Sequence, residues 1–227
     1  MSKRISHSLI DPWLGPKFKA AYPHLHIPHR FPPEGIIAVG HVSALLGGIG
    51  FAFAGATWWG GFFAAAGVFG NHFADCLDGT HARSTGQCRN GGELLDHFTD
   101  PISFCYWMIG LAIACGRMEL GIALVMILMA TAVLTNIKTK MINEFTLATF
   151  GPTEFKALLS GFGLFLSIWA LTQGTTLLPM IMLWTAVVLV VVGVIQLIVN
   201  LVIAVKEVNA KGSAPDTSEW NNTRSAA

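Results

Sequence analysis

The chain reads Asp75-Cys-Leu-Asp78-Gly79-Thr-His-Ala82-Arg83 and, after eight further residues, Gly92-Glu-Leu-Leu-Asp96-His97-Phe-Thr-Asp100. Long hydrophobic stretches lie on both sides of this segment. Ionisable side chains are costly at membrane depth, so acidic residues in such surroundings are candidates for a functional site. The segment therefore bears on both the fold and the chemistry.

The spacing of the aspartates predicts how they are arranged. On helices, Asp75 and Asp78 (i, i+3) share one face, and Asp96 and Asp100 (i, i+4) share one face of the next helix. The sequence between the pairs is rich in Gly, Ser, Thr and Asn, which is typical of a loop. A helical hairpin would bring the four carboxylates together, where they could not all remain ionised without compensating charge.

Divalent cations would supply that charge. Carboxylate oxygens suit Mg²⁺, Mn²⁺ or Ca²⁺, and four such groups are enough for two ions. The alternative interpretation is a set of helix caps and salt bridges at a membrane surface. Four carboxylates at helical spacing favour the metal site.

The composition predicts an all-α, polytopic membrane protein. The chain has 227 residues, of which 53% are hydrophobic and 12% charged, and its mean hydropathy is +0.58. A formal net charge of +1 gives no electrostatic case for a nucleic-acid partner, and none is expected.

The hydrophobic pattern divides the chain into three parts. Residues 1–35 are predicted to form a cytoplasmic interfacial segment, residues 36–206 a domain of six transmembrane helices, and residues 207–227 a disordered cytoplasmic tail. The six helices are expected at about residues 36–57, 60–82, 92–115, 119–137, 157–171 and 178–205. Glycines in the first and fifth of these are expected to allow close helix packing: Gly47, Gly48, Gly50, Gly55, Gly161 and Gly163.

The distribution of basic residues predicts the orientation. With six spans, both termini lie on one side of the membrane, together with every Lys and Arg of the 14 in the chain except Arg117. Cytoplasmic loops carry the excess of Lys and Arg, so the termini and the acidic segment are expected to be cytoplasmic.

The acidic segment resembles the signature of the CDP-alcohol phosphotransferases, D-x2-D-G-x2-A-R-x8-G-x3-D-x3-D. The chain matches all eight fixed positions: Asp75, Asp78, Gly79, Ala82, Arg83, Gly92, Asp96 and Asp100. The intervening residues are similar to the choline/ethanolamine phosphotransferase branch, which carries A-R-x-T-G and G-E-L-x-D-H at positions 82–86 and 92–97.

This resemblance implies a reaction and a role for each site residue. A CDP-alcohol donates its substituted phosphate to a lipid alcohol such as diacylglycerol, and CMP is released. Two Mg²⁺ or Mn²⁺ ions are held by Asp75, Asp78, Asp96 and Asp100, with Gly79, Ala82 and Arg83 binding the nucleotide. Asp100 is the implied general base, whereas His97 is a rival because imidazole titrates near neutrality. The resemblance also implies a homodimer in membrane lipid.

Three alternatives remain open at this point. The donor could be CDP-diacylglycerol with a small polar alcohol as acceptor. The carboxylates taken alone would also fit a divalent-cation transporter, and an inactive scaffold would share the fold.

A second stretch bears on the head group. Asn143–Thr146 and Gly151–Glu154 resemble an E-Y-H-T and a G-P-V-E of the same branch, but Phe145 replaces Tyr and no His precedes Thr146. The alternative for this stretch is a re-entrant cytoplasmic loop capped by polar residues.

Overall fold

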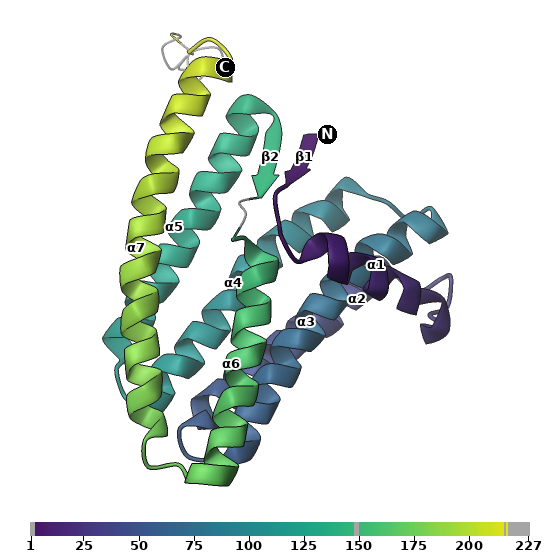
Figure 1. Cartoon of the computed structure of the whole chain (residues 1–227). Helices are drawn as coiled ribbons and strands as arrows, with labels where there is room; N and C mark the ends of the chain where they lie inside the picture. Colours follow the sequence, from purple (N-terminus) through teal and green to yellow (C-terminus); the bar gives the residue numbers. More distant parts are fainter. Residues whose placement is uncertain (1–2, 148–149, 216, 218–227) are drawn as a thin grey trace, which may run out of the picture.

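Six long helices form the body of the protein. The computed structural model describes residues 3–147, 150–215 and 217, with side chains for residues 7–146, 150–215 and 217. The long helices are α2 (Pro33–Ala54), α3 (Trp58–Thr85), α4 (Asn90–Cys115), α5 (Met118–Ile142), α6 (Pro152–Gln173) and α7 (Leu178–Lys211). Each overlaps one of the six predicted hydrophobic segments, and the all-α membrane class is confirmed (Figure 1).

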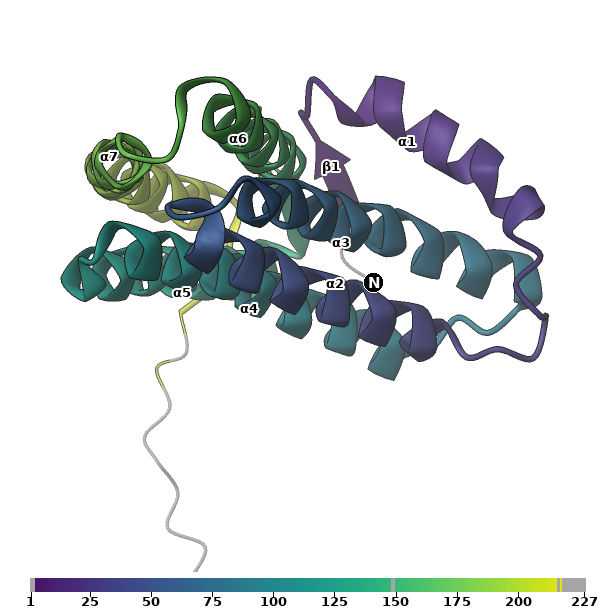
Figure 2. The same ribbon diagram turned by 90° about the horizontal axis from the view of Figure 1, so that it is seen from below.

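Five of these helices are long and apolar enough to cross a membrane: α2, α4, α5, α6 and α7. Helix α3 is not among them, so the predicted number of six spans is not confirmed. Its sequence is rich in glycine and carries Asn71, His72 and the first two aspartates, which lowers its hydropathy. It packs between α2 and α6, and its inner face is therefore covered by protein (Figure 2).

Short elements add to this bundle at one end. They are the strands β1 (Lys3–Ser6) and β2 (Glu144–Leu147), the helix α1 (Asp11–Ala21) and a 3₁₀ turn at Tyr22–Leu25. The strands pair in parallel, with Lys3 opposite Glu144. Strand β1 and the C-terminal end of α7 lie toward the same end of the molecule (Figure 1). The parallel pair was not predicted, because its strands are far apart in the sequence and only four residues long.

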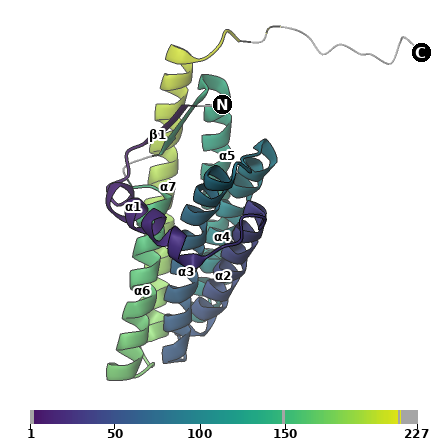
Figure 3. The ribbon, with the colours of Figure 1, turned by 90° about the vertical axis from the view of Figure 1, so that its right-hand side faces the viewer.

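Helix α1 lies across the outer side of α3 (Figure 3). Its Phe18 is buried and makes edge-to-face ring contacts with Phe69, His72 and Phe73 of α3. By contrast, Leu9 just before the helix and Trp13 within it are exposed, and the Lys17 ammonium lies 3.4 Å from the Trp13 ring centroid. One face of α1 therefore packs on the bundle, while apolar and basic side chains remain outside.

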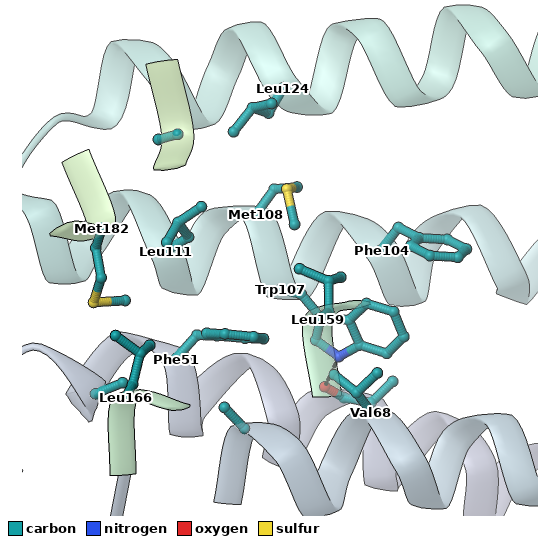
Figure 4. Close-up of a cluster of buried hydrophobic side chains, with 14 of the residues drawn as sticks. Phe51, Val68, Phe104, Trp107, Met108, Leu111, Leu124, Leu159, Leu166 and Met182 are labelled. Atoms are coloured by element: carbon teal, nitrogen blue, oxygen red, sulfur yellow. Dashed lines mark hydrogen bonds between the residues drawn. The ribbon is translucent and has the colours of Figure 1, made fainter. Parts of the chain in front are cut away.

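The core lies between the helices, below the short elements. Phe51, Trp107, Leu111, Leu159 and Met182 are almost completely buried there, although they come from four different helices (Figure 4). The Trp107 indole donates a 2.9 Å hydrogen bond to the Ala44 carbonyl oxygen, which satisfies its one polar atom. This core fixes α4 against α2, and thereby fixes the start of α4 where two of the aspartates lie.

Most of the predicted packing glycines are at close helix contacts. A Cβ added at Gly50 would lie 2.2 Å from the Ala64 nitrogen, and one at Gly163 would lie 2.7 Å from the Ala65 nitrogen. Gly47, Gly48 and Gly55 also face a neighbouring helix closely, so the prediction is confirmed for these five. It is wrong for Gly161, where a Cβ would have no neighbour within 4 Å.

These two glycines of α6 give a matched stability test. We expect Gly163→Ala to lower the thermal stability of the purified protein, because the added methyl group forces α6 away from α3 and overpacking of this kind costs about 1–3 kcal/mol. Gly161→Ala, two residues earlier on the same helix, should leave the melting temperature unchanged or slightly higher. Equal melting temperatures for the two variants would contradict the close α3–α6 contact.

Candidate metal centre

The four predicted aspartates meet in one place. Asp75 and Asp78 lie on α3, whereas Asp96 and Asp100 lie near the start of α4. Thr57 caps the start of α3 through a hydrogen bond from the Gly60 N–H, and α3 ends where Gly86 adopts a left-handed φ of 70°. The sharp turn after Gly86 allows α4 to run back along the bundle. All four carboxylates line the same small pocket, together with Ile37, Gly40, His41, Asn71, Thr99 and Ser103.

Three of the carboxylates form a tight cluster. Asp75, Asp96 and Asp100 each offer one oxygen atom, and these three atoms lie within 4.8 Å of one another. The donors are all hard oxygen atoms, which fits Mg²⁺ or Mn²⁺ and does not fit a soft thiophilic ion. The residues present are therefore chemically suited to the metal that the sequence implies.

Asp78 lies at the edge of this cluster. Its side chain is buried, and its Oδ1 accepts a hydrogen bond from the N–H of the next residue, Gly79. It lines the pocket but does not belong to the group of three close oxygen donors. The four predicted ligands therefore line one pocket. Asp75, Asp96 and Asp100 form the close group of oxygen donors, and Asp78 lies next to them.

A lysine that the sequence analysis did not assign to the site completes the cluster. The Lys156 ammonium donates hydrogen bonds to Asp75 Oδ2 at 2.9 Å and to Asp100 Oδ1 at 3.1 Å. Its side chain is only 1% exposed, although a lysine at the start of a membrane helix ordinarily extends toward water. The hydrophobic pattern predicts Lys156 in a loop just before the fifth span, where nothing distinguishes it from the other lysines expected on the cytoplasmic side.

The residues predicted to bind the nucleotide lie beyond the carboxylates on α3. The Arg83 guanidinium folds back over Gly79, where an added Cβ would lie 3.1 Å from Arg83 Nη1. Arg83 is exposed and Ala82 is half-buried. Glycine at position 79 therefore leaves room for the guanidinium on this face of α3.

His97 has different surroundings from those of Asp100. Its imidazole makes an edge-to-face contact with Phe145 of β2, with 5.0 Å between ring centroids. It is not among the residues that line the carboxylate pocket, whereas Asp100 is. Thus the two candidates for the general base are both present at this end of α4 but face different neighbours.

A comparison with protein-family models assigns the chain to a known family. The model of the CDP-alcohol phosphatidyltransferases matches residues 37–212, which covers all six long helices except the first four residues of α2. The chain belongs to this family. No curated protein matches the chain significantly.

Membership in the CDP-alcohol phosphatidyltransferases gives the class of reaction. The protein is a membrane-embedded transferase of phospholipid synthesis that moves a substituted phosphate group from a CDP-alcohol to an alcohol acceptor. This result decides in favour of the enzyme over the cation transporter that the carboxylates alone would also fit. Members of the family generally use a divalent metal, in agreement with the oxygen donor set described above.

The stretch before α6 of this transferase has a structural role in the chain. Glu154 Oε1 accepts hydrogen bonds from Ser8 Oγ at 2.5 Å and from the Leu9 N–H at 2.8 Å, while its Oε2 accepts one from the Gly151 N–H at 2.9 Å. Glu154 thereby caps α6 and holds the N-terminal segment against it. These contacts support the interpretation of this stretch as a capped loop, and Glu154 does not line the carboxylate pocket.

Proposed function

We propose that this transferase moves phosphocholine or phosphoethanolamine from the CDP-alcohol to diacylglycerol, with release of CMP. The observation that carries the proposal is the pocket lined by Asp75, Asp78, Asp96 and Asp100, which lies among α2, α3 and α4 of the family domain. The choice of donor and acceptor rests on the similarity of residues 82–86 and 92–97 to the choline/ethanolamine branch.

The proposed roles of the residues follow from their positions. Asp75, Asp96 and Asp100 hold two Mg²⁺ or Mn²⁺ ions with the help of Asp78. When bound, the ions would neutralise the pyrophosphate and stabilise negative charge at phosphorus. Gly79 and Ala82 let the nucleotide approach α3, and the forked N–H donors of Arg83 bind a phosphate group.

We assign the general base to Asp100. It takes the proton of the acceptor hydroxyl, which attacks the phosphorus distal to the nucleoside, so that the bond from this phosphorus to the CMP oxygen breaks. Asp100 lines the carboxylate pocket, whereas His97 lies against Phe145, and this difference supports the assignment.

The arrangement in the membrane is part of the proposal. We infer six spans, with α3 as the sixth, and a cytoplasmic location for the carboxylate pocket and both termini. The basic residues gather on that side, and the α3–α4 connection and β1 lie toward it. Exposed Leu9, Trp13 and Lys17 suit α1 to the membrane interface, and the exposed apolar side chains of α7 suit contact with lipid. We also propose a homodimer, which the family resemblance implies.

Cysteine labelling tests this orientation. After the native cysteines are removed, cysteines at Gln87 and Ala214 should react with an impermeant maleimide only in permeabilised cells, because both positions lie on the proposed cytoplasmic side. A cysteine at Thr175, in the connection between α6 and α7 at the opposite end, should react in intact cells. Labelling of Gln87→Cys from outside intact cells would refute the orientation.

One observation favours the second candidate, a CDP-diacylglycerol donor with a small polar alcohol as acceptor. Phe145 replaces the Tyr of the choline/ethanolamine branch, and its ring packs against His97. The Tyr hydroxyl of that branch is therefore missing at this position of the chain. The two candidates share the carboxylate pocket and differ in which substrate carries the lipid.

A substrate panel separates the two candidates. Purified protein is given either CDP-choline or CDP-ethanolamine with diacylglycerol, or CDP-diacylglycerol with glycerol phosphate, inositol phosphate or serine. We expect CMP and a phospholipid product from the first set. Product from the second set alone would replace our substrate assignment, and no CMP from either set would refute the proposed function.

A further inference from the structure

Lys156 combines two features, burial and hydrogen bonds to two aspartates of the proposed metal centre. It is almost completely buried, and its two described hydrogen bonds both end on aspartates of the proposed metal centre. Burial of an ammonium is costly unless it is paired, so a lysine here depends on Asp75 and Asp100 for its own stability. The same two carboxylates are donors in the cluster suited to a divalent cation.

The position of the Lys156 backbone is fixed by tight packing of α6 on α3. Ser160 Oγ donates a 3.1 Å hydrogen bond to the Ala65 carbonyl oxygen, and Gly163 lies against the Ala65 backbone. The neighbouring Phe155 stacks on Phe104 of α4, with 5.5 Å between ring centroids. Helix α6 thus presents Lys156 to both carboxylate-bearing helices.

Those two helices make few direct contacts with each other. At the level of the cluster, Asn71 Nδ2 of α3 donates a 3.4 Å hydrogen bond to Ser103 Oγ of α4. The Lys156 ammonium links the charged groups of the two helices by bonding to Asp75 on α3 and to Asp100 on α4. A cation held by the same carboxylates would join them in the same way. The ammonium and a divalent cation would therefore both neutralise the charge of the same two carboxylates.

We propose that Lys156 is a tethered counter-ion of the carboxylate cluster, which competes with divalent cations for Asp75 and Asp100 and keeps α3 and α4 together when no cation is bound. This inference rests on the proposed metal centre but concerns a residue outside its ligand set. Its consequence is that the chain weakens its own affinity for the metal and gains a metal-free state that stays folded.

The test is a titration of the full-length protein with Mn²⁺ in the absence of nucleotide, followed by electron paramagnetic resonance of the free ion. Lys156→Gln removes the charge and keeps much of the side-chain length. We expect it to bind Mn²⁺ about tenfold more tightly than the wild type, the order expected when one like charge is removed next to two ligands. Lys156→Arg keeps the charge and should bind Mn²⁺ no more tightly than the wild type.

A matched control is Lys138→Gln. Lys138 is partly buried, and its ammonium forms an ion pair, 2.5 Å from Glu207 Oε2. It lies on α5 and does not line the carboxylate pocket. Its Mn²⁺ affinity should equal that of the wild type. Thermal melting supplies a second readout: in EDTA, Lys156→Gln should melt below the wild type, and saturating Mn²⁺ should bring the two together.

Each outcome has a defined meaning. Mn²⁺ affinity of Lys156→Gln equal to or weaker than that of the wild type would overturn the inference. Should Lys156→Gln not fold in EDTA, recovery of folded protein by purification in Mn²⁺ supports the inference, and failure to recover contradicts it. Absence of CMP release by a wild-type protein that binds Mn²⁺ would instead refute the proposed function and leave the Lys156 result intact.

Discussion

Asp96→Asn is expected to abolish CMP release while the protein remains folded. Asp96 contributes one of the three oxygen atoms in the cluster, and none of the ion pairs found among the described residues uses its carboxylate. The substitution therefore removes one negative charge from the proposed metal centre and leaves the Lys156 contacts in place. The loss should reach several orders of magnitude, because metal-assisted stabilisation of charge at phosphorus depends on bound cations.

The measurement is CMP release at saturating donor and Mg²⁺, with EDTA as a second way to remove the metal. Glu119→Gln is the matched control, since Glu119 is exposed and pairs with Arg117 in the connection at the opposite end of the bundle. It should retain the activity of the wild type. An Asp96→Asn protein with full activity would contradict a metal centre built on these carboxylates.

Asp100→Asn and His97→Ala are expected to differ by orders of magnitude. If Asp100 is both ligand and base, Asp100→Asn should be inactive at every metal concentration and pH. We expect His97→Ala to lose less than about tenfold in turnover, because its imidazole packs on Phe145 and would only orient its neighbours. General-base catalysis itself is typically worth about 10²–10⁴-fold.

Turnover alone does not separate a base from a ligand, so the metal dependence is measured as well. The half-saturating Mg²⁺ concentration of His97→Ala should equal that of the wild type. A near-complete loss of turnover in His97→Ala with an unchanged metal titration would transfer the role of the base from Asp100 to His97.

The helices and the meeting of the four aspartates in one pocket were predictable from the sequence, because local patterns determine both. The i, i+3 and i, i+4 spacing of the aspartates required only that both flanks be helical, and both are, although α3 continues to Thr85, beyond the predicted end at about residue 82. Close packing at Gly50 and Gly163 was also predictable, since a small residue in an apolar helix has few other uses.

The parts that the sequence did not predict depend on contacts between distant segments. The bond from Ser8 to Glu154 spans 146 positions, and the β1–β2 pair joins the N-terminus to the segment before α6. Neither has a periodic signal. Lys156 lies at the boundary of a predicted span, where a lysine side chain can extend either toward water or toward the carboxylates. The packing of α6 on α3 turns this side chain toward the carboxylates, and the sequence pattern does not contain that packing.

The predicted helices are shorter than the observed ones where polar residues extend a helix beyond its apolar segment. Helix α6 begins at Pro152, five residues before the predicted start, because Pro152 and Glu154 form its first turn. Helix α7 continues to Lys211, so the first residues of the predicted disordered tail are helical; most of the remaining tail lies outside the described residues.

We expect the carboxylates of α3 and α4 to hold two divalent cations. The most direct measurement is the number of Mn²⁺ ions bound per chain of purified protein at saturation, determined by electron paramagnetic resonance or by elemental analysis after gel filtration. Two ions per chain are expected in the wild type and fewer in Asp96→Asn. A wild-type protein that binds no Mn²⁺, or an Asp96→Asn protein that still binds two ions as tightly, would contradict this expectation.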